Sequence, residues 1–180
     1  MGRTVAVVLG AAGVGKTSLV KRFVSGSFSA GYEPTLEDLY TKRVYVDGRD
    51  FSMEIIDTAG SEPFETMREM YIGVGDCLVV CYSIDSPVSF REARRILEAI
   101  WRVRKDSPPV YLVGTKSDLV DRRDISAVKG QELADEVGCL FSEASSFRGS
   151  HVDDVFYGLC KSLCAKKKKA SCSFFLCRHF

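Results

Sequence analysis

The sequence predicts an α/β domain built on a doubly wound, six-stranded and mostly parallel sheet with one antiparallel edge strand. Three observations support this class. Short apolar β-branched runs alternate with longer amphipathic patterns along the chain. A glycine-rich segment separates the first such run from the first helical pattern. Interior runs such as residues 77–82 are apolar on both faces, as in a sheet that is covered on both sides.

The elements follow from these patterns in order. Strands are expected near residues 3–9, 39–46, 51–56, 77–83, 110–114 and 139–142, and helices near 16–25, 65–73, 87–104, 126–137 and 151–165. Residues 47–50 include an Asp-Gly pair that is typical of a tight hairpin, so the strand at 39–46 is expected to run antiparallel at the sheet edge. Helical spacing in 87–104 predicts a core face of Phe90, Ala93, Leu97, Ile100 and Trp101.

Composition indicates one globular domain, residues 1–165, and a basic, cysteine-containing tail, residues 166–180. The chain has 180 residues, of which 46% are hydrophobic and 27% charged. Its net charge of +1 hides an asymmetry, because the tail carries five positive side chains and no acid. An acidic body with a basic end favours a membrane-facing tail over nucleic-acid binding. The seven cysteines include no pair with metal-ligand spacing, which favours a reducing, cytoplasmic compartment.

Residues 10–17 read Gly-Ala-Ala-Gly-Val-Gly-Lys-Thr, a phosphate-binding loop between the apolar run 5–9 and a helical pattern. Glycines allow successive backbone N–H groups to surround an anion at a helix N-terminus. Lys16 is expected to reach the β- and γ-phosphates, and the Thr17 hydroxyl to bind Mg²⁺. The residues expected to contact the nucleotide here are Gly13, Val14, Gly15, Lys16, Thr17 and Ser18.

Asp57-Thr58-Ala59-Gly60 follows the apolar strand end at 55–56. An aspartate at that position, opposite the phosphate loop, can hold the Mg²⁺ shell. Gly60 has no Cβ, so its N–H can approach the γ-phosphate. Alone, these residues are equally compatible with a turn that ends a strand.

Thr115-Lys116-Ser117-Asp118 follows the strand near 110–114 and favours guanine over adenine. The Asp118 carboxylate suits the N1–H and amino donors of guanine, which adenine does not offer. Lys116 and Phe28 are expected to cover the two faces of the base. Ser145 is expected to orient Asp118 and to offer its N–H to the guanine oxygen, with Ser146 beside it.

These segments, together with Pro34-Thr35, resemble the five nucleotide motifs of Ras-superfamily small GTPases, in family order, over residues 3–165. The resemblance implies a P-loop small G domain that binds GTP or GDP with Mg²⁺, hydrolyses GTP and signals by switching between the two forms. It implies that Thr35 joins Thr17 and Asp57 at the metal and contacts the γ-phosphate. The catalytic residues it implies are Lys16, Thr35, Gly60 and Ser61.

Two departures from the family bear on hydrolysis. Ser61 stands where most members have a glutamine that orients the attacking water. Ala12 replaces a common glycine, and its methyl is expected to crowd the γ-phosphate. We therefore expect a slow GTPase. The alternative is a GTP-loaded binding module with negligible hydrolysis, and a P-loop kinase or ATPase is a more distant one. Thr115 replaces an asparagine, so faster nucleotide release is also expected.

Residues 32–40 resemble the effector loop of the Ras and Rap branch. That likeness implies a partner with a ubiquitin-like Ras-binding domain, and an exchange factor and an activating protein at the two switch regions. The chain itself is expected to be monomeric.

The tail combines Lys166–Lys169 with Cys172 and Cys177, which together could attach the protein to the cytoplasmic face of an anionic membrane. Prenylation at 177–180, S-acylation, electrostatic attachment and an inert disordered tail remain open.

Overall fold

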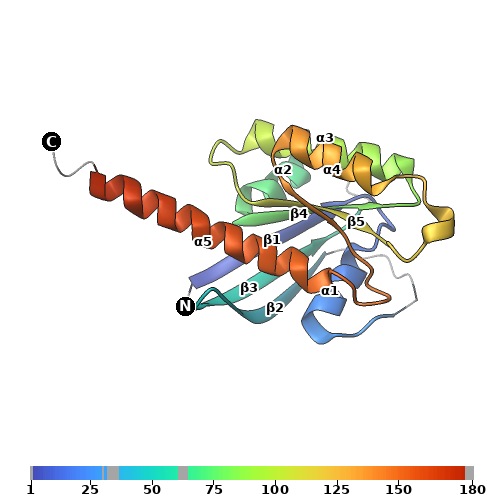
Figure 1. The fold of residues 1–180 in the computed structure, drawn as a ribbon, viewed down its shortest axis with the longest axis horizontal. Coiled ribbons are helices and arrows are strands. Elements are labelled where there is room, and N and C mark those ends of the chain that lie inside the picture. Colours follow the sequence, from blue (N-terminus) through green and yellow to red (C-terminus); the bar gives the residue numbers. More distant parts are fainter. Residues whose placement is uncertain (1, 30, 32–36, 61–64, 177–180) are drawn as a thin grey trace.

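The computed structural model describes residues 2–29, 31, 37–60 and 65–176, and the side chains of 65 and 167–176 are not among the described parts. Figure 1 shows a central sheet with helices on both faces and a long C-terminal helix that projects from the body. The six strands lie in the order β2-β3-β1-β4-β5-β6. All neighbouring pairs are parallel except β2 with β3. The doubly wound prediction is confirmed.

The elements match the predicted order. The strands are β1 (Gly2–Gly10), β2 (Glu37–Val46), β3 (Arg49–Thr58), β4 (Cys77–Ser83), β5 (Val110–Thr115) and β6 (Leu140–Glu143). The helices are α1 (Lys16–Ser25), α2 (Glu65–Val74), α3 (Pro87–Val103), α4 (Ala127–Val137) and α5 (Val152–Leu176), with a short 3₁₀ turn, η1 (Val120–Arg122). The turn η1 was not predicted, because three residues carry no periodic pattern.

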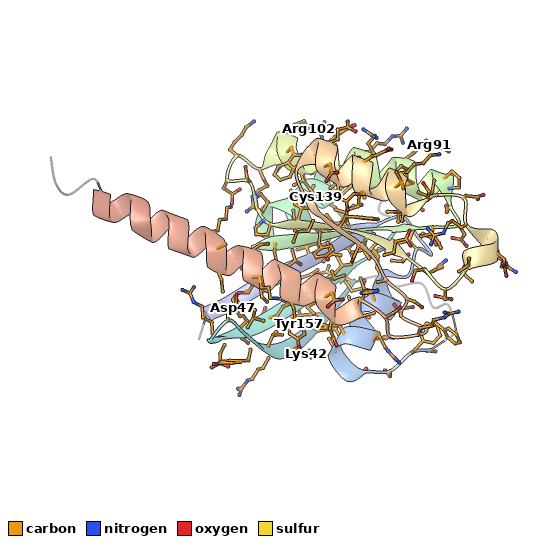
Figure 2. The ribbon with its side chains drawn as sticks, in the orientation of Figure 1. Lys42, Asp47, Arg91, Arg102, Cys139 and Tyr157 are labelled. Carbon is orange, nitrogen blue, oxygen red and sulfur yellow. The ribbon has the colours of Figure 1, made fainter. Side chains whose placement is uncertain are left out.

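Two apolar cores hold the layers together. One core lies between the sheet and helices α1 and α5, and the other between the sheet and helices α2, α3 and α4. The predicted core face of α3 is confirmed, since Ala93, Leu97 and Ile100 are fully buried while Phe90 and Trp101 pack partly buried against them. On the other side, Lys42 of β2 lies over the Phe23 ring of α1, near Tyr157 of α5 (Figure 2).

Local signals explain several element ends. Asp47 and Gly48 both have positive φ, of 49° and 74°, and join β2 to β3 as a two-residue hairpin turn. The Ser86 hydroxyl accepts a hydrogen bond from the Ser89 N–H at 3.2 Å and caps α3, which begins with Pro87. The order of the strands places β1 between β3 and β4, which is the switch point of a doubly wound sheet. Ligands bind at the carboxyl ends of the strands at such a point.

Helix α5 is longer than expected. The pattern predicted a helix near 151–165, and the structure continues it to Leu176, within the segment assigned to the tail. Residues 159–176 contain no glycine or proline, and alanine, leucine and lysine favour helix, so nothing in the sequence ends it earlier. Within the described residues, no helix has both the length and the apolar character that crossing a bilayer requires.

Candidate functional site

The loop between β1 and α1 has the backbone of an anion site. Gly13 and Gly15 have φ of +71° and +95°, values that side chains rarely tolerate. At Gly10 a Cβ would lie 2.4 Å from the Cys81 carbonyl oxygen, so the loop can leave the sheet here only at a glycine. Gly15 is the N-cap of α1 and no side chain caps this end. The first N–H groups of α1 therefore remain available to an anion.

The Lys16 side chain lies across the phosphate loop. Its ammonium donates hydrogen bonds to the carbonyl oxygens of Gly10 and Ala11, both at 3.0 Å, and the residue is only 6% exposed. Burial lowers the pKa of Lys16 below its ordinary value, while the nearby Asp57 carboxylate acts in the opposite direction. A phosphate would supply the negative charge that this buried cation lacks.

Asp57, near the end of β3, has the features of a cation ligand. Its side chain is fully buried, and neither carboxylate oxygen has a hydrogen-bond partner of normal geometry among the described residues. Burial raises the pKa of Asp57, although the Thr17 hydroxyl and the Lys16 ammonium nearby lower it. Two buried acceptor oxygens beside a threonine hydroxyl fit Mg²⁺ and its bound water. Thr35, the third expected metal ligand, lies outside the described residues.

Gly60 packs directly on the phosphate loop. A Cβ added at Gly60 would lie 2.4 Å from both the backbone nitrogen and the Cα of Ala12, so no larger residue fits without movement. The Thr58 hydroxyl donates to the Val8 carbonyl at 2.8 Å and fixes the strand end before it. Ser61 lies outside the described residues, and nothing in the structure bears on its role.

The base-recognition segments meet beyond β5 and β6. The Ser145 hydroxyl is fully buried and donates to the Asp118 carboxylate, as the sequence predicts. The Arg148 N–H in turn donates to this hydroxyl at 3.1 Å. The Ser145 N–H, expected to face the base, is already bonded to the Ser150 carbonyl at 3.1 Å. Ser146 follows Ser145 directly in the chain. In the other segment, Lys116 has a positive φ of 58°, a backbone conformation that is often found at functional sites.

Thr115 joins the base side of the site to the phosphate side. Its hydroxyl lies 2.5 Å from the Val14 carbonyl oxygen and 2.8 Å from that of Tyr82, and the residue is buried. One hydroxyl has one proton, so it donates to these acceptors in turn. The threonine hydroxyl therefore links the end of β5 to the phosphate loop.

Phe28, expected to cover the base, forms an edge-to-face pair with Phe147. The ring centroids are 5.5 Å apart, and the two side chains are exposed by 37% and 63%. The motifs did not include Phe147, although its position directly after Ser145-Ser146 was a usable signal.

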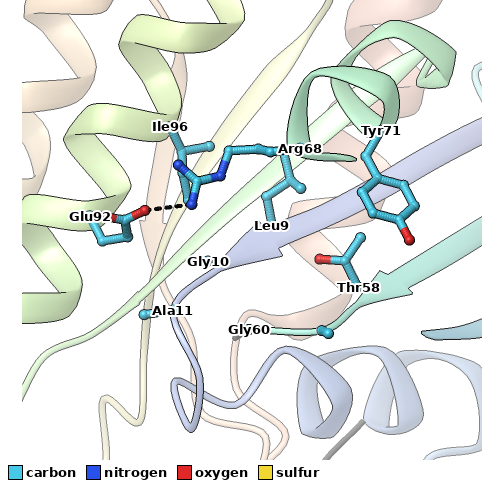
Figure 3. Close-up of a pocket in the computed structure, with 10 residues that line it drawn as sticks. Leu9, Gly10, Ala11, Thr58, Gly60, Arg68, Tyr71, Glu92 and Ile96 are labelled. Carbon is cyan, nitrogen blue, oxygen red and sulfur yellow. Dashed lines mark ion pairs between the residues drawn. The ribbon is translucent and has the colours of Figure 1, made fainter. Parts of the chain in front are cut away.

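A pocket lies beside the phosphate loop, on the α2–α3 side (Figure 3). Its wall includes Leu9, Gly10, Gly60 and Tyr71. Across it, Arg68 of α2 and Glu92 of α3 form an ion pair at 2.8 Å. The pocket adjoins the region where the γ-phosphate is expected, but its lining does not include Lys16 or Asp57. The candidate nucleotide site is therefore made by the phosphate loop and the carboxyl ends of the strands, rather than by this pocket.

The chain is similar to known proteins along most of its length. A family model described as "Ras family" matches residues 5–165. The chain is 41% identical to "GTP-binding protein Rit1" from Mus musculus over 164 residues, which cover 91% of this chain and 75% of that protein.

Proposed function

Because this chain belongs to the Ras family of small GTPases, whose members bind guanine nucleotides and hydrolyse GTP, we propose that it is a slow, Mg²⁺-dependent GTPase switch. The observation that carries the proposal is the Asp118–Ser145 hydrogen bond. This bond would orient the Asp118 carboxylate as an acceptor for a purine edge, while Thr115 connects the same region to the phosphate loop. Adenine lacks the donors that this carboxylate needs.

The proposed reaction is in-line attack of water on the γ-phosphorus, with cleavage of the bond to the β–γ bridging oxygen and release of phosphate. The Lys16 ammonium and the N–H groups at the start of α1 stabilise negative charge on the phosphate oxygens. Asp57, Thr17 and Thr35 would hold Mg²⁺, which neutralises charge on the β- and γ-oxygens when bound. The Gly60 N–H would meet the γ-phosphate, and Ser61 would contact the attacking water.

Slow hydrolysis is proposed from Ser61 and Ala12. A serine side chain is shorter than glutamine and holds the attacking water less well. The Ala12 backbone already touches Gly60, so the alanine methyl adds bulk where space is scarce. The same observations favour the second candidate, a GTP-loaded module that recruits effectors with negligible hydrolysis.

The same purified protein can be used to test which nucleotide it binds and how fast it hydrolyses GTP. The purified chain should retain guanine nucleotide with Mg²⁺ present, and excess ATP should not displace it. Single-turnover hydrolysis should be slow and should rise in a Ser61→Gln, Ala12→Gly double variant. Fast turnover by the unmodified chain would exclude the slow GTPase, and no turnover with or without an activating protein would favour the binding module.

Partners are proposed on the same basis. The free edge of β2 and the exposed carboxylates of Glu37 and Asp38 support docking of a basic, ubiquitin-like effector domain. Exchange factors and activating proteins would act on the switch segments. Affinity for such a domain should fall when Glu37 and Asp38 are both changed to glutamine or asparagine, and unchanged affinity would exclude this edge.

For localisation we propose peripheral attachment at the cytoplasmic face of a membrane, from the Lys166–Lys169 tract and the tail cysteines. Sedimentation with anionic and with neutral vesicles tests the electrostatic part. Fractionation of a Cys172→Ser, Cys177→Ser variant tests acylation, and an unchanged distribution would remove the cysteines from the proposal.

A further inference from the structure

The loop between α3 and β5 lies at the amino ends of the strands, away from the proposed nucleotide site. The Pro109 carbonyl accepts a hydrogen bond from the Leu78 N–H at 3.0 Å, so this loop borders the first residues of both β4 and β5. The phosphate loop instead follows the carboxyl end of β1, which runs parallel to β4. A partner that met the α3–β5 loop would therefore leave the nucleotide site uncovered.

Helix α5 is attached to this loop through Lys166. The Lys166 ammonium donates a hydrogen bond to the Asp106 carbonyl, 60 positions earlier in the chain. The helix runs without a break from Val152 to Leu176, and Figure 1 shows its last turns projecting from the body. A helix, rather than a flexible linker, thus joins the Lys166–Lys169 tract to the body. The fold therefore sets where the tract lies relative to the loop.

The exposed charge around this contact is mainly positive. Lys105 and Lys166 are both exposed, and within the described part of the chain neither forms an ion pair. The Asp106 carboxylate between them in the loop is occupied, because Arg104 donates to both of its oxygens at 2.7 Å. Asp76, the other acid near Arg104, already accepts a backbone N–H at 2.8 Å. The two lysines therefore present positive charge that the nearby acids do not neutralise.

The sequence beyond the lysine tract favours a membrane as the partner of this surface. Residues 172–177 read Cys-Ser-Phe-Phe-Leu-Cys, an apolar end with two thiols that suits insertion or acylation. At 1.5 Å per residue, the helix advances only about 15 Å from Lys166 to Leu176. A bilayer that holds this end therefore lies close to the α3–β5 loop as well.

We infer that Lys105 and Lys166 form a second membrane contact, on the folded domain itself, which binds anionic lipid headgroups beside the tail. The inference rests on the proposed membrane attachment and adds an orientation to it. The amino ends of the strands face the bilayer, and the proposed nucleotide site faces away from it. Each lysine near an anionic leaflet strengthens attachment about 5-fold, so Lys105 contributes although it lies far from the tail in the sequence.

The test measures sedimentation of the full chain with vesicles of phosphatidylcholine that contain phosphatidylserine. Lys105→Gln should lower the partition coefficient about 5-fold. With vesicles of phosphatidylcholine alone, Lys105→Gln and the unmodified chain should not differ, because the contact is electrostatic. Since Lys105 is exposed, the variant should keep the Tm of the unmodified chain.

The matched control is Lys129→Gln, which makes the same change of charge at the opposite edge of the sheet. Lys129 is exposed on the first turn of α4. This helix begins beyond the carboxyl end of β4, because the Ile125 N–H bonds the Ile84 carbonyl at 2.9 Å. The partition coefficient of Lys129→Gln should equal that of the unmodified chain.

Fluorescence gives an independent measure of the orientation. Trp101 is the single tryptophan of the chain and lies near the end of α3, close to the loop. In anionic vesicles, lipids with a spin-labelled headgroup should quench it. They should quench less in a Trp101→Phe, Val88→Trp variant, which moves the fluorophore to the start of α3. Val88 is 65% exposed and Trp101 is partly buried, so exposure alone would give the opposite order.

Several outcomes would overturn the inference. These are equal partition of Lys105→Gln and the unmodified chain, an equal loss in Lys129→Gln, and stronger quenching at position 88. Normal vesicle binding by Lys105→Gln together with weaker binding of polyglutamate would assign the surface to an acidic protein instead. If the unmodified chain does not sediment with anionic vesicles, the proposed membrane attachment itself fails.

Discussion

The Tyr71 hydroxyl on α2 donates a 2.7 Å hydrogen bond to the Glu37 carboxylate at the start of β2. The two residues are 34 positions apart and belong to the segments that follow Gly60 and the effector loop. The bond therefore couples α2, in the proposed second switch, to the edge strand β2, where an effector is proposed to dock. A basic partner that binds Glu37 must share this carboxylate with Tyr71.

Tyr71→Phe should loosen this coupling. Loss of one partly buried hydrogen bond to a charged group is expected to lower the free energy of unfolding by about 1.5–3 kcal/mol. Amide hydrogens of α2 should exchange faster with solvent, as mass spectrometry can measure. Tyr45→Phe, at a side chain that is 69% exposed, is the control. Equal exchange in both variants would show that the bond does not hold α2.

The Asp57→Asn variant should distinguish the effect of Asp57 on the stability of the fold from its effect on Mg²⁺ binding. A fully buried carboxylate that has no hydrogen bond of normal geometry among the described residues destabilises the metal-free chain, so the variant should unfold at an equal or higher Tm in a chelator. With GDP present, Mg²⁺ at about 100 times its Kd should stabilise the unmodified chain by roughly 2.7 kcal/mol and the variant far less. Asp121→Asn, on the exposed turn η1, should behave as the unmodified chain. Equal Mg²⁺ stabilisation of Asp57→Asn would refute the assignment.

Thr115→Val tests the link from the base side to the phosphate loop. Valine fills the same space but cannot donate to the Val14 and Tyr82 carbonyls. The free energy of unfolding should fall by about 1–3 kcal/mol and GDP should leave faster. Thr41→Val, at an exposed position of β2, is the matched control for both denaturation and release. If Thr115→Val released GDP as slowly as the unmodified chain and were equally stable, the Thr115 hydroxyl would be dispensable.

The ion pair between Arg104 and Asp106, at the end of α3, should make the stability of the fold depend on pH. Its guanidinium donates two 2.7 Å hydrogen bonds to Asp106, which lower the pKa of that carboxyl to about 2. The ionised pair therefore stabilises the fold above pH of about 4, the unfolded-state value, and the contribution is lost as the pH falls through about 2. The gain is small, because Asp106 is 58% exposed and solvent screens the pair.

In Arg104→Gln, a carbon NMR titration should return the Asp106 midpoint to about 4. The variant should also loosen the end of α2, because Arg104 donates to the Ile72 and Gly75 carbonyls, both at 2.7 Å. Asp106→Asn removes the titrating group and keeps those donors, so only Arg104→Gln should speed amide exchange near residues 72–75. A midpoint that stays near 2 would contradict the assigned cause.

Much of the fold could be predicted because local patterns determine it. The hairpin follows from Asp47-Gly48, and the phosphate loop from glycine spacing that recurs as positive φ in the structure. The Asp118–Ser145 contact followed from motif order. The Tyr71–Glu37 bond and the Phe28–Phe147 pair could not be predicted, because each joins residues distant in the sequence whose types allow many other contacts. The length of α5 was underestimated because a change in composition at residue 166 is no helix stop.

No side chain caps the first turn of α1, and the buried Asp57 oxygens have no hydrogen bond of normal geometry in the described part of the chain. Both features bear on the stability of the empty protein. Under the proposed function, a bound nucleotide and a bound cation would complete this polar pairing and so stabilise the fold. The empty chain should therefore unfold at a lower temperature than the chain with nucleotide bound. A protein that removes the nucleotide would have to supply substitute contacts to these groups until another nucleotide binds.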